Sequence, residues 1–247
     1  MVSVISDIGN GRSINQDFTG YFEENEIRFY AIADGMGGHN AGEIASEIAI
    51  KTTIEVIRSN LNTEDLEQLM RNAISEANKK IYNLSNKDKA LKGMGTTITT
   101  CLIKDSKAVI ANVGDSSCIA INGYNIFKIT RDHSLVQELI DSGDITEEEA
   151  QNHPNKNIIT RALGTNASVE VDIFILNPCE VEKFILCTDG LTNKVKLSEI
   201  LEIVYNNNEE ESCKKLVQLS KYKGSSDNIS VIVFEGVRKY DRDYTRE

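Results

Sequence analysis

The sequence of 247 residues contains no tryptophan, two prolines and three histidines. Its five cysteines are odd in number and show no Cys-x-x-Cys spacing, so neither a disulfide framework nor a thiolate zinc site is indicated. No cysteine has an arginine six positions later, which excludes the Cys-x5-Arg loop of thiol phosphatases. We therefore expect core thiols in a reducing compartment.

The sequence also lacks long apolar runs and an excess of positive charge. No run approaches the roughly 20 residues that a membrane span requires. Residues Met1–Asp7 contain no basic leader before a long apolar core, so we expect no signal peptide and a cytoplasmic location. The net charge of −11 argues against nucleic acid and anionic membranes as partners, because both attract basic surfaces.

The rest of the composition is that of a globular protein, with 40% hydrophobic and 26% charged residues. Apolar runs of strand length are interrupted by two pairs of amphipathic helices, one pair between residues 41 and 84 and the other between 197 and 220. Hairpins imply antiparallel sheets, and each helix pair needs a sheet face to cover. This order predicts an α+β fold, a four-layer α/β/β/α sandwich in which helix pairs flank two central antiparallel β-sheets.

The domain organisation follows from where this pattern is interrupted. No internal linker stands out, so we expect a single domain over residues 1–237, followed by a polar tail over 238–247. Residues from about 143 to 165 are acidic, contain the only His-Pro dipeptide and show little periodicity. These properties predict a surface insertion.

Four aspartates recur at the ends of apolar, strand-like runs. They are Asp34 after 29–33, Asp115 after 108–113, Asp189 after 184–188 and Asp227 before 229–234. A single aspartate of this kind is more often a capping residue of a turn, but four along most of the chain indicate one cluster in space. Because the three histidines are scattered and oxygen ligands suit hard cations, the pattern predicts a site for one or two Mg²⁺ or Mn²⁺ ions.

Two local patterns allow more than one interpretation. Gly35-Met36-Gly37 begins like a G-x-G-x-x-G dinucleotide loop, but Asn40 replaces the third glycine and the preceding aspartate would repel a pyrophosphate, so we set that interpretation aside. Arg12 lies on a glycine-rich loop and could bind a phosphate dianion through its bidentate fork. It could equally be a surface arginine without a function, and the local sequence leaves both open.

Eight motifs stand in the order found in the metal-dependent Ser/Thr protein phosphatases, the PPM or type-2C family. They are Asp7-x-Gly9-x-x-Arg12-x-x-Asn15-Gln16-Asp17, Asp34-Gly35-Met-Gly-Gly-His39, Gly95-Thr96-Thr97, Asn112-Val-Gly114-Asp115-Ser116, Asp132-His133-Ser134, Arg161-Ala-Leu-Gly164, Thr188-Asp189-Gly190-Leu191 and Asp227-Asn228-Ile-Ser230. The match runs from about residue 2 to residue 234, and the chain resembles the bacterial branch. The resemblance implies a phosphatase that hydrolyses phosphoserine and phosphothreonine in proteins and opposes a bacterial Ser/Thr kinase.

The resemblance also implies two Mn²⁺ or Mg²⁺ ions and a weaker third. Asp34 would bridge two ions, with the Gly35 carbonyl on one of them, and Asp189 and Asp227 would complete the other. Asp115 would share the third ion with Asp189. A water or hydroxide bridging the two metals would then attack phosphorus directly, without a phosphoenzyme intermediate.

Further roles are implied outside the direct metal ligands. Asp17 would hold metal-bound waters, with Gln16 and Asn228 beside it, and Arg12 would bind the substrate phosphate. The insertion at 143–165 would be the flap beside the site. Expected partners are phosphorylated proteins and a cognate kinase, and a monomer is expected.

The chain departs from the family pattern at three positions. Gln16 stands where the family usually has glutamate, so we expect weaker metal affinity or a changed metal preference rather than loss of activity. Ser117 stands where arginine commonly follows Gly-Asp-Ser. His39 lies five residues after the first aspartate, where it could be the general acid for the leaving serine oxygen or merely pack within its loop.

Two rival functions are weaker. A non-catalytic binding module of the same fold is disfavoured because the costly clustered charges are intact. Residues 241–245 match the D-x-D-x-T pattern of aspartyl-phosphate phosphatases, but that motif must follow a buried strand and here it sits in a polar tail. We interpret the match as coincidence.

Overall fold

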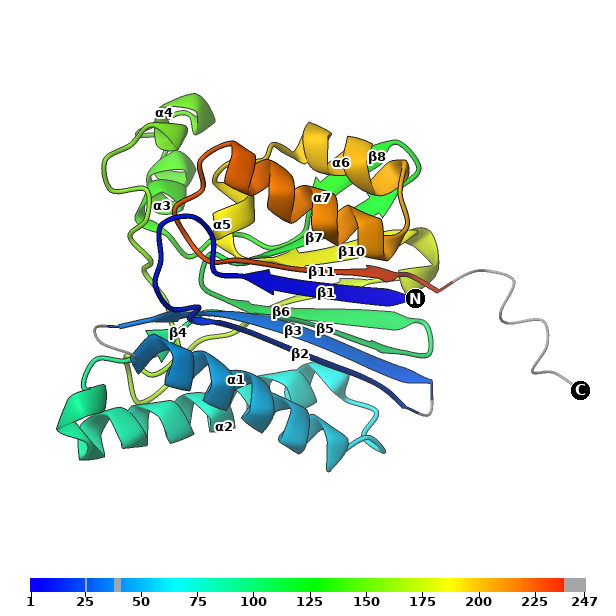
Figure 1. Ribbon diagram of the computed structural model, residues 1–247. Helices are drawn as coiled ribbons and strands as arrows, with labels where there is room; N and C mark the ends of the chain where they lie inside the picture. The colour runs from blue at the N-terminus through cyan, green and yellow to red at the C-terminus, as the bar shows by residue number, and fades with distance from the viewer. Residues whose placement is uncertain (25, 38–40, 238–247) are drawn as a thin grey trace, which may run out of the picture.

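Four layers stack in the computed structural model, which describes residues 1–24, 26–37 and 41–237. Two antiparallel sheets face each other, and each carries a pair of helices on its outer face (Figure 1). The predicted α/β/β/α sandwich is therefore confirmed. The polar tail at 238–247 lies outside the described residues. No helix in the described part of the chain combines the length and the hydropathy needed to cross a bilayer.

The first sheet has the order β2-β3-β5-β6-β9, with the short strand β4 paired to β3. Its strands are β2 (Asp17–Glu24), β3 (Ile27–Met36), β4 (Gly95–Thr96), β5 (Ile98–Lys104), β6 (Lys107–Val113) and β9 (Asp172–Leu176). Helices α1 (Ala41–Arg58) and α2 (Leu66–Lys87) cover its outer face, and the short 3-10 helix η1 (Lys89–Leu91) follows α2 (Figure 1). The apolar stripe predicted for the second helix lies buried along α2.

The second sheet has the order β1-β11-β10-β7-β8, so the first and the last described strands are neighbours. Its strands are β1 (Val2–Asp7), β7 (Ser117–Asn122), β8 (Asn125–Lys128), β10 (Lys183–Cys187) and β11 (Ile229–Glu235). Helices α6 (Leu197–Tyr205) and α7 (Glu209–Tyr222) cover its outer face. The remaining helices are α3 (Leu135–Ser142), α4 (Glu147–Gln151), the 3-10 helix η2 (Pro178–Glu180) and α5 (Asp189–Thr192).

Three apolar cores hold the layers together, one under each helix pair and one between the sheets. Alternation along the central strands supplies all three, because successive side chains point to opposite faces. On β3, Phe29 and Ala31 face the helices, while Tyr30 faces the other sheet. Tyr30 stacks on Phe234 of β11 with 3.7 Å between ring centroids. Strands buried on both faces explain the continuous apolar runs in the sequence.

The surface insertion predicted over 143–165 is shorter than expected, because its last residues return to the core. Leu163 is fully buried and exchanges two backbone hydrogen bonds with Thr96. The segment also contains helix α4, which begins with a capping box between Thr146 and Glu149. We expected little regular structure there, although the Thr-x-x-Glu spacing is a recognisable helix start.

Candidate metal centre

The predicted aspartates lie together at one end of the sandwich, where strands of both sheets meet. The first sheet supplies Asp17 at the start of β2, Asp34 in β3 and Asp115 just after β6. The second sheet supplies Asp189, which follows β10, and Asp227, which precedes β11. We call these five residues the carboxylate cluster. The end of β3 and the start of β11 lie at the left-hand end of the sheets in Figure 1, beside the loop that follows β1.

Asp34 is held by its main chain from the neighbouring strand. Its N–H donates to Thr97 Oγ1 at 2.9 Å, and its carbonyl accepts from the Thr97 N–H and the Thr96 hydroxyl, each at 2.9 Å. We had expected the strand to end before this aspartate, but it does not. It continues to Met36 because β4 pairs with its last two residues. The Gly95-Thr96-Thr97 motif therefore positions Asp34.

Gly35, which follows Asp34, is required by the close packing of the backbone at this point. A Cβ at this position would lie 2.1 Å from the carbonyl oxygen of Gly42 and 2.6 Å from that of Gln16. The Gly35 N–H donates to the Gln16 carbonyl at 3.1 Å, and Ser46 Oγ donates to the same oxygen at 2.6 Å. These hydrogen bonds fix helix α1 and the start of β2 against the segment that follows Asp34.

Asp17 joins the two sheets. It pairs with Asp34 across β2 and β3, and its Oδ2 accepts from Thr188 Oγ1 at 2.9 Å. Thr188 in turn accepts from the main-chain N–H of Ser230 at 3.0 Å and immediately precedes Asp189. A single hydroxyl thus fixes the position of one aspartate relative to the next.

Burial and mutual repulsion raise the pKa values of the cluster. Burial is the main cause that raises the pKa of Asp34 well above its usual value, and the other four carboxylates raise it further. Burial likewise raises the pKa of Asp17 to about 7 and that of Asp189 to about 6, with neighbouring carboxylates adding to both. Buried carboxylates that lie close together are stabilised either by taking up protons or by binding a cation.

The chemistry of the cluster fits divalent cations. The Oδ1 atoms of Asp17, Asp115 and Asp189 are buried and have no hydrogen-bond partner, which is costly for a charged oxygen unless a cation is close. No three His, Cys, Asp or Glu side chains among residues 1–24, 26–37 and 41–237 form a preformed metal site. Mg²⁺ and Mn²⁺ do not need one, since one or two carboxylates, a main-chain carbonyl and waters complete their shell. The residues present therefore fit such ions.

Arg12 lies on the edge of the cluster and pairs with Asp227. Its Nη2 donates to Oδ2 at 2.9 Å and its Nε lies 2.9 Å from Oδ1. Gly9 allows the loop to come this close, since it has φ of +73° and a Cβ would lie 1.8 Å from the Asp227 carbonyl oxygen. The hydrogen bonds to Asp227 raise the pKa of Arg12, so it stays charged.

The side chain of Asn228 holds the same loop through three hydrogen bonds. Its side-chain oxygen accepts from the Gln16 N–H at 2.9 Å, and its nitrogen donates to the carbonyls of Ile8 and Ile14, each at 3.0 Å. Every contact is thus to the main chain of the loop that carries Arg12. We had placed Asn228 beside the metals, and these contacts show that its side chain positions the loop.

Asp115 is held through the residues on either side of it. Ser116 Oγ is 2.9 Å from Thr97 Oγ1, and the Gly114 N–H donates to His133 Nδ1 at 2.9 Å. The segment 131–133 thereby lies against the Asp115 turn, and burial raises the pKa of Asp115, with the charges of Asp189 and Asp132 as further causes. We expected no role for Asp132 beyond its motif, and no sequence signal marks its pairing with Lys128, because that pairing depends on how the chain turns after β8.

Three further positions were singled out in the sequence, His39, Gln16 and Ser117. His39 lies outside the described residues. The Gln16 side chain packs against Gly42, with its Nε2 2.7 Å from where a Cβ there would be. Ser117, at the family's usual arginine position, is fully buried at the start of β7.

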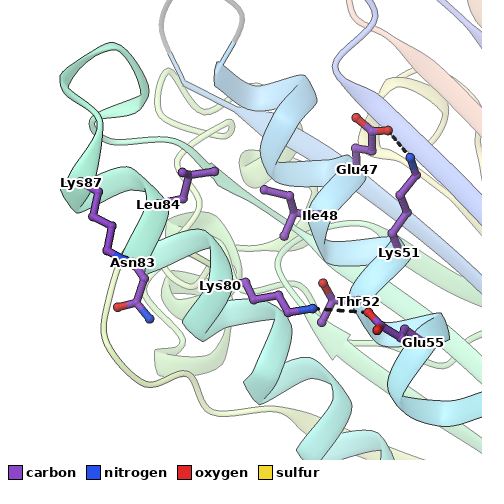
Figure 2. A pocket seen from close by; sticks show the side chains of 9 residues that line it. All are labelled: Glu47, Ile48, Lys51, Thr52, Glu55, Lys80, Asn83, Leu84 and Lys87. Atoms are coloured by element: carbon purple, nitrogen blue, oxygen red, sulfur yellow. Dashed lines mark hydrogen bonds and ion pairs between the residues drawn. The ribbon is translucent and has the colours of Figure 1, made fainter. Parts of the chain in front are cut away.

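A hollow away from the cluster lies between α1 and α2. Its lining includes the ion pairs Lys51–Glu47 and Lys80–Glu55 (Figure 2). None of the carboxylate cluster lines it, and its charged groups are largely satisfied by one another. We assign it no role in the chemistry.

Comparison with known proteins shows the family of the chain. The family model described as protein phosphatase 2C matches residues 8–220. A serine/threonine phosphatase, stp, of Listeria monocytogenes is 38% identical over 235 residues, which cover 93% of each chain.

Solved structures show the same fold. The serine/threonine phosphatase Stp1 from Staphylococcus aureus is 36% identical with a TM-score of 0.85, covering 96% of this chain and 94% of its own. The catalytic domain of the serine/threonine protein phosphatase PstP, in complex with two manganese ions, is 30% identical with a TM-score of 0.83, covering 96% and 98%. The chain therefore belongs to the protein phosphatase 2C family, as the resemblance of its motifs to the bacterial branch predicted.

Proposed function

We propose that this protein hydrolyses phosphoserine and phosphothreonine in other proteins with the help of divalent cations. The observation that carries the proposal is the carboxylate cluster, built from both sheets, with Arg12 at its edge. The relatives named above as serine/threonine phosphatases, and the manganese complex of one of them, support it. The reaction adds water to phosphorus, breaks the P–O bond to the side-chain oxygen and returns a proton to that oxygen.

Asp34, with the Gly35 carbonyl, and Asp189 and Asp227 would hold two Mn²⁺ or Mg²⁺ ions. When bound, two such ions activate a water as the nucleophile and neutralise charge on the phosphate. Asp17 would accept hydrogen bonds from waters at the cluster. It is suited to this because one of its oxygens is fixed by Thr188 while the other has no partner.

Arg12 would bind the phosphate of the substrate through charge-assisted hydrogen bonds. The clamp from Asn228 fixes its loop, so the guanidinium is positioned before substrate arrives. A weaker third ion would lie between Asp115 and Asp189, both of which carry a buried oxygen without a partner. His39 is proposed as the general acid on the strength of the sequence alone.

The biological setting is also a proposal. The enzyme would act on phosphoproteins and oppose a Ser/Thr kinase of the same cell. We also propose a monomer, as expected from the sequence. All five cysteines are free, which supports the reducing cytoplasm as its compartment.

Hydrolysis of p-nitrophenyl phosphate and of a phosphoserine peptide, with Mn²⁺ and with excess EDTA, tests the proposal. We expect activity only with the metal, and loss of most turnover in Asp34→Asn and Asp189→Asn proteins that remain folded. Glu67→Gln is a matched control, since it removes an exposed carboxylate in the helix layer. Full activity in EDTA, or in Asp34→Asn, would refute the proposal.

A further inference from the structure

A lysine stands beside the part of the cluster proposed for the third ion. Lys128, the last residue of β8, places its Nζ 2.7 Å from Oδ2 of Asp132, and both side chains are partly exposed, at 29% and 24%. The other oxygen of Asp132, Oδ1, is buried and has no partner. Asp132 is thus half satisfied by the lysine and half available to another cation.

Asp132 and Asp115 are brought together by the main chain. Asn112 Nδ2 donates to the carbonyls of Gly114 and Arg131, each at 3.1 Å, and the His133 N–H donates to the Gly114 carbonyl at 3.0 Å. Each aspartate therefore follows a residue that is tied to the same asparagine. The nearby Arg131 side chain is directed elsewhere, since it pairs with Asp141.

The lysine also influences Asp115. Burial and the charges of Asp189 and Asp132 raise the pKa of Asp115, while the charge of Lys128 acts in the opposite direction. Asp115 is 8% exposed and its Oδ1 has no partner. Three carboxylates with unpartnered buried oxygens, those of Asp115, Asp132 and Asp189, therefore share their surroundings with one fixed ammonium group.

We propose that Lys128 is a built-in competitor of the third divalent ion and sets the metal concentration at which that ion binds. The inference rests on the proposed function, because it concerns an ion held by the same cluster. The ammonium occupies one Asp132 oxygen and repels an incoming dication. The ions held by Asp34 and Asp227 do not depend on Asp132, so they should not respond to the lysine.

Calorimetric titration with Mn²⁺, with free Mn²⁺ counted by electron paramagnetic resonance, separates the tight ions from the weak one without measuring activity. Lys128→Met keeps the aliphatic stem and removes the charge. We expect the dissociation constant of the weak ion to fall roughly three- to thirty-fold, as for loss of one partly screened charge, and the tight ions to change less than about twofold. Lys128→Arg should behave like the parent protein.

Lys51→Met is the matched control, because Lys51 forms a similar pair with Glu47 four residues away but on α1 (Figure 2). It changes the net charge equally and should leave all constants unchanged. An unchanged weak constant in Lys128→Met, an equal shift in Lys51→Met, or no third ion in any variant would overturn the inference. The first two results would leave the proposed two-ion phosphatase unaffected. If the parent protein bound no tight ions, both the proposed function and the inference about Lys128 would be refuted.

Discussion

Arg12 and Asp227 form a two-pronged ion pair at the edge of the carboxylate cluster, with both nitrogen–oxygen distances at 2.9 Å. The guanidinium proposed to bind phosphate is thus held by a carboxylate proposed to bind metal. The side chains are 49% and 33% exposed, so the pair is open to solvent and to competing ions. If both assignments hold, substrate phosphate competes with Asp227 for Arg12, and a divalent cation competes with Arg12 for Asp227.

Replacement of Arg12 should weaken substrate binding and leave metal binding intact. Loss of charge-assisted hydrogen bonds worth ~1.5–3 kcal/mol each should raise KM roughly ten- to a hundred-fold in Arg12→Ala. Mn²⁺ affinity should stay equal or increase, since Asp227 loses a competing cation. Steady-state kinetics and calorimetry on the same preparations measure both. Arg12→Lys keeps the charge but not the bidentate geometry, so its KM should lie between those of the parent protein and Arg12→Ala. An unchanged kcat/KM in Arg12→Ala would contradict the assignment.

The stability of chelator-treated protein should fall as pH rises from about 4 to about 7. The pKa values of Asp17 and Asp189 are raised from 3.8 to about 7 and about 6, mainly by burial. The folded state therefore holds protons that the unfolded chain releases, and stability declines with pH across this window. Thermal unfolding in EDTA at several pH values measures the slope.

Two comparisons test the origin of that slope. Asp17→Asn should flatten it, and saturating Mn²⁺ should remove it at neutral pH by stabilising the charged carboxylates. A melting temperature that rises with pH in EDTA, or an identical slope in Asp17→Asn, would show that these aspartates are not the cause.

Thr97→Val should lower both the stability of the protein and its affinity for Mn²⁺. The substitution leaves the buried N–H of Asp34 without its acceptor, at a cost of about 1–3 kcal/mol. For a domain of this size the melting temperature should fall by roughly 2–10 °C. Thr97→Ser keeps the hydroxyl and should retain the parent's Mn²⁺ affinity. If the valine and serine variants bind Mn²⁺ equally well, the hydroxyl does not position Asp34.

Asp115→Ala should keep two metal ions and lose much of its turnover. A third ion held by few carboxylates and water should be weak, since Mg²⁺ and Mn²⁺ shed water reluctantly. Metal titration should be paired with kinetics on a phosphopeptide and on p-nitrophenyl phosphate, because the loss should depend on the leaving group. Glu67→Ala serves as the charge-matched control. Loss of all metal binding, or parent-like turnover of both substrates, would argue against a third ion at Asp115.

Alkylation of thiols under native conditions should spare activity. Cys101, Cys118, Cys187 and Cys213 are fully buried, and burial raises the pKa of each, to about 12 for Cys187 and about 11 for Cys213. Only Cys179 is partly exposed. Only the thiol of Cys179 should therefore react quickly, and no thiol should react quickly in the Cys179→Ser protein. Rapid inactivation that substrate prevents would mean that a cysteine contributes to the site.

Four members of the carboxylate cluster could be predicted because each stands at the end of an apolar run, which is visible in the sequence alone. Asp17 was expected only from the resemblance. The partners of those aspartates could not be predicted. Thr97 contacts Asp34 across a strand pairing, and Thr188 contacts Asp17 across the two sheets. Such contacts depend on register and on sheet packing, which period-two alternation does not specify.

Short elements and charged pairs were missed for a related reason. Helix α5 has four residues, too few to show a helical period, and it begins at Asp189 itself. The pairing of Lys128 with Asp132 depends on how the chain turns after β8. Leu163 was assigned to a surface insertion because the segment around it is acidic and shows little periodicity. In the structure it is buried and pairs with Thr96.

Strand β11 lies between β1 and β10, so the interior of the second sheet is completed by the last of the described strands in chain order. The segment just before it carries Asp227 and Asn228, which hold the Arg12 loop. On the ribosome, β1 must therefore wait until residues 229–235 have emerged before it finds this partner. A nascent chain stopped before residue 227 has neither Asp227 nor Asn228, so we expect the cluster and the Arg12 loop to take their positions only after this segment has emerged.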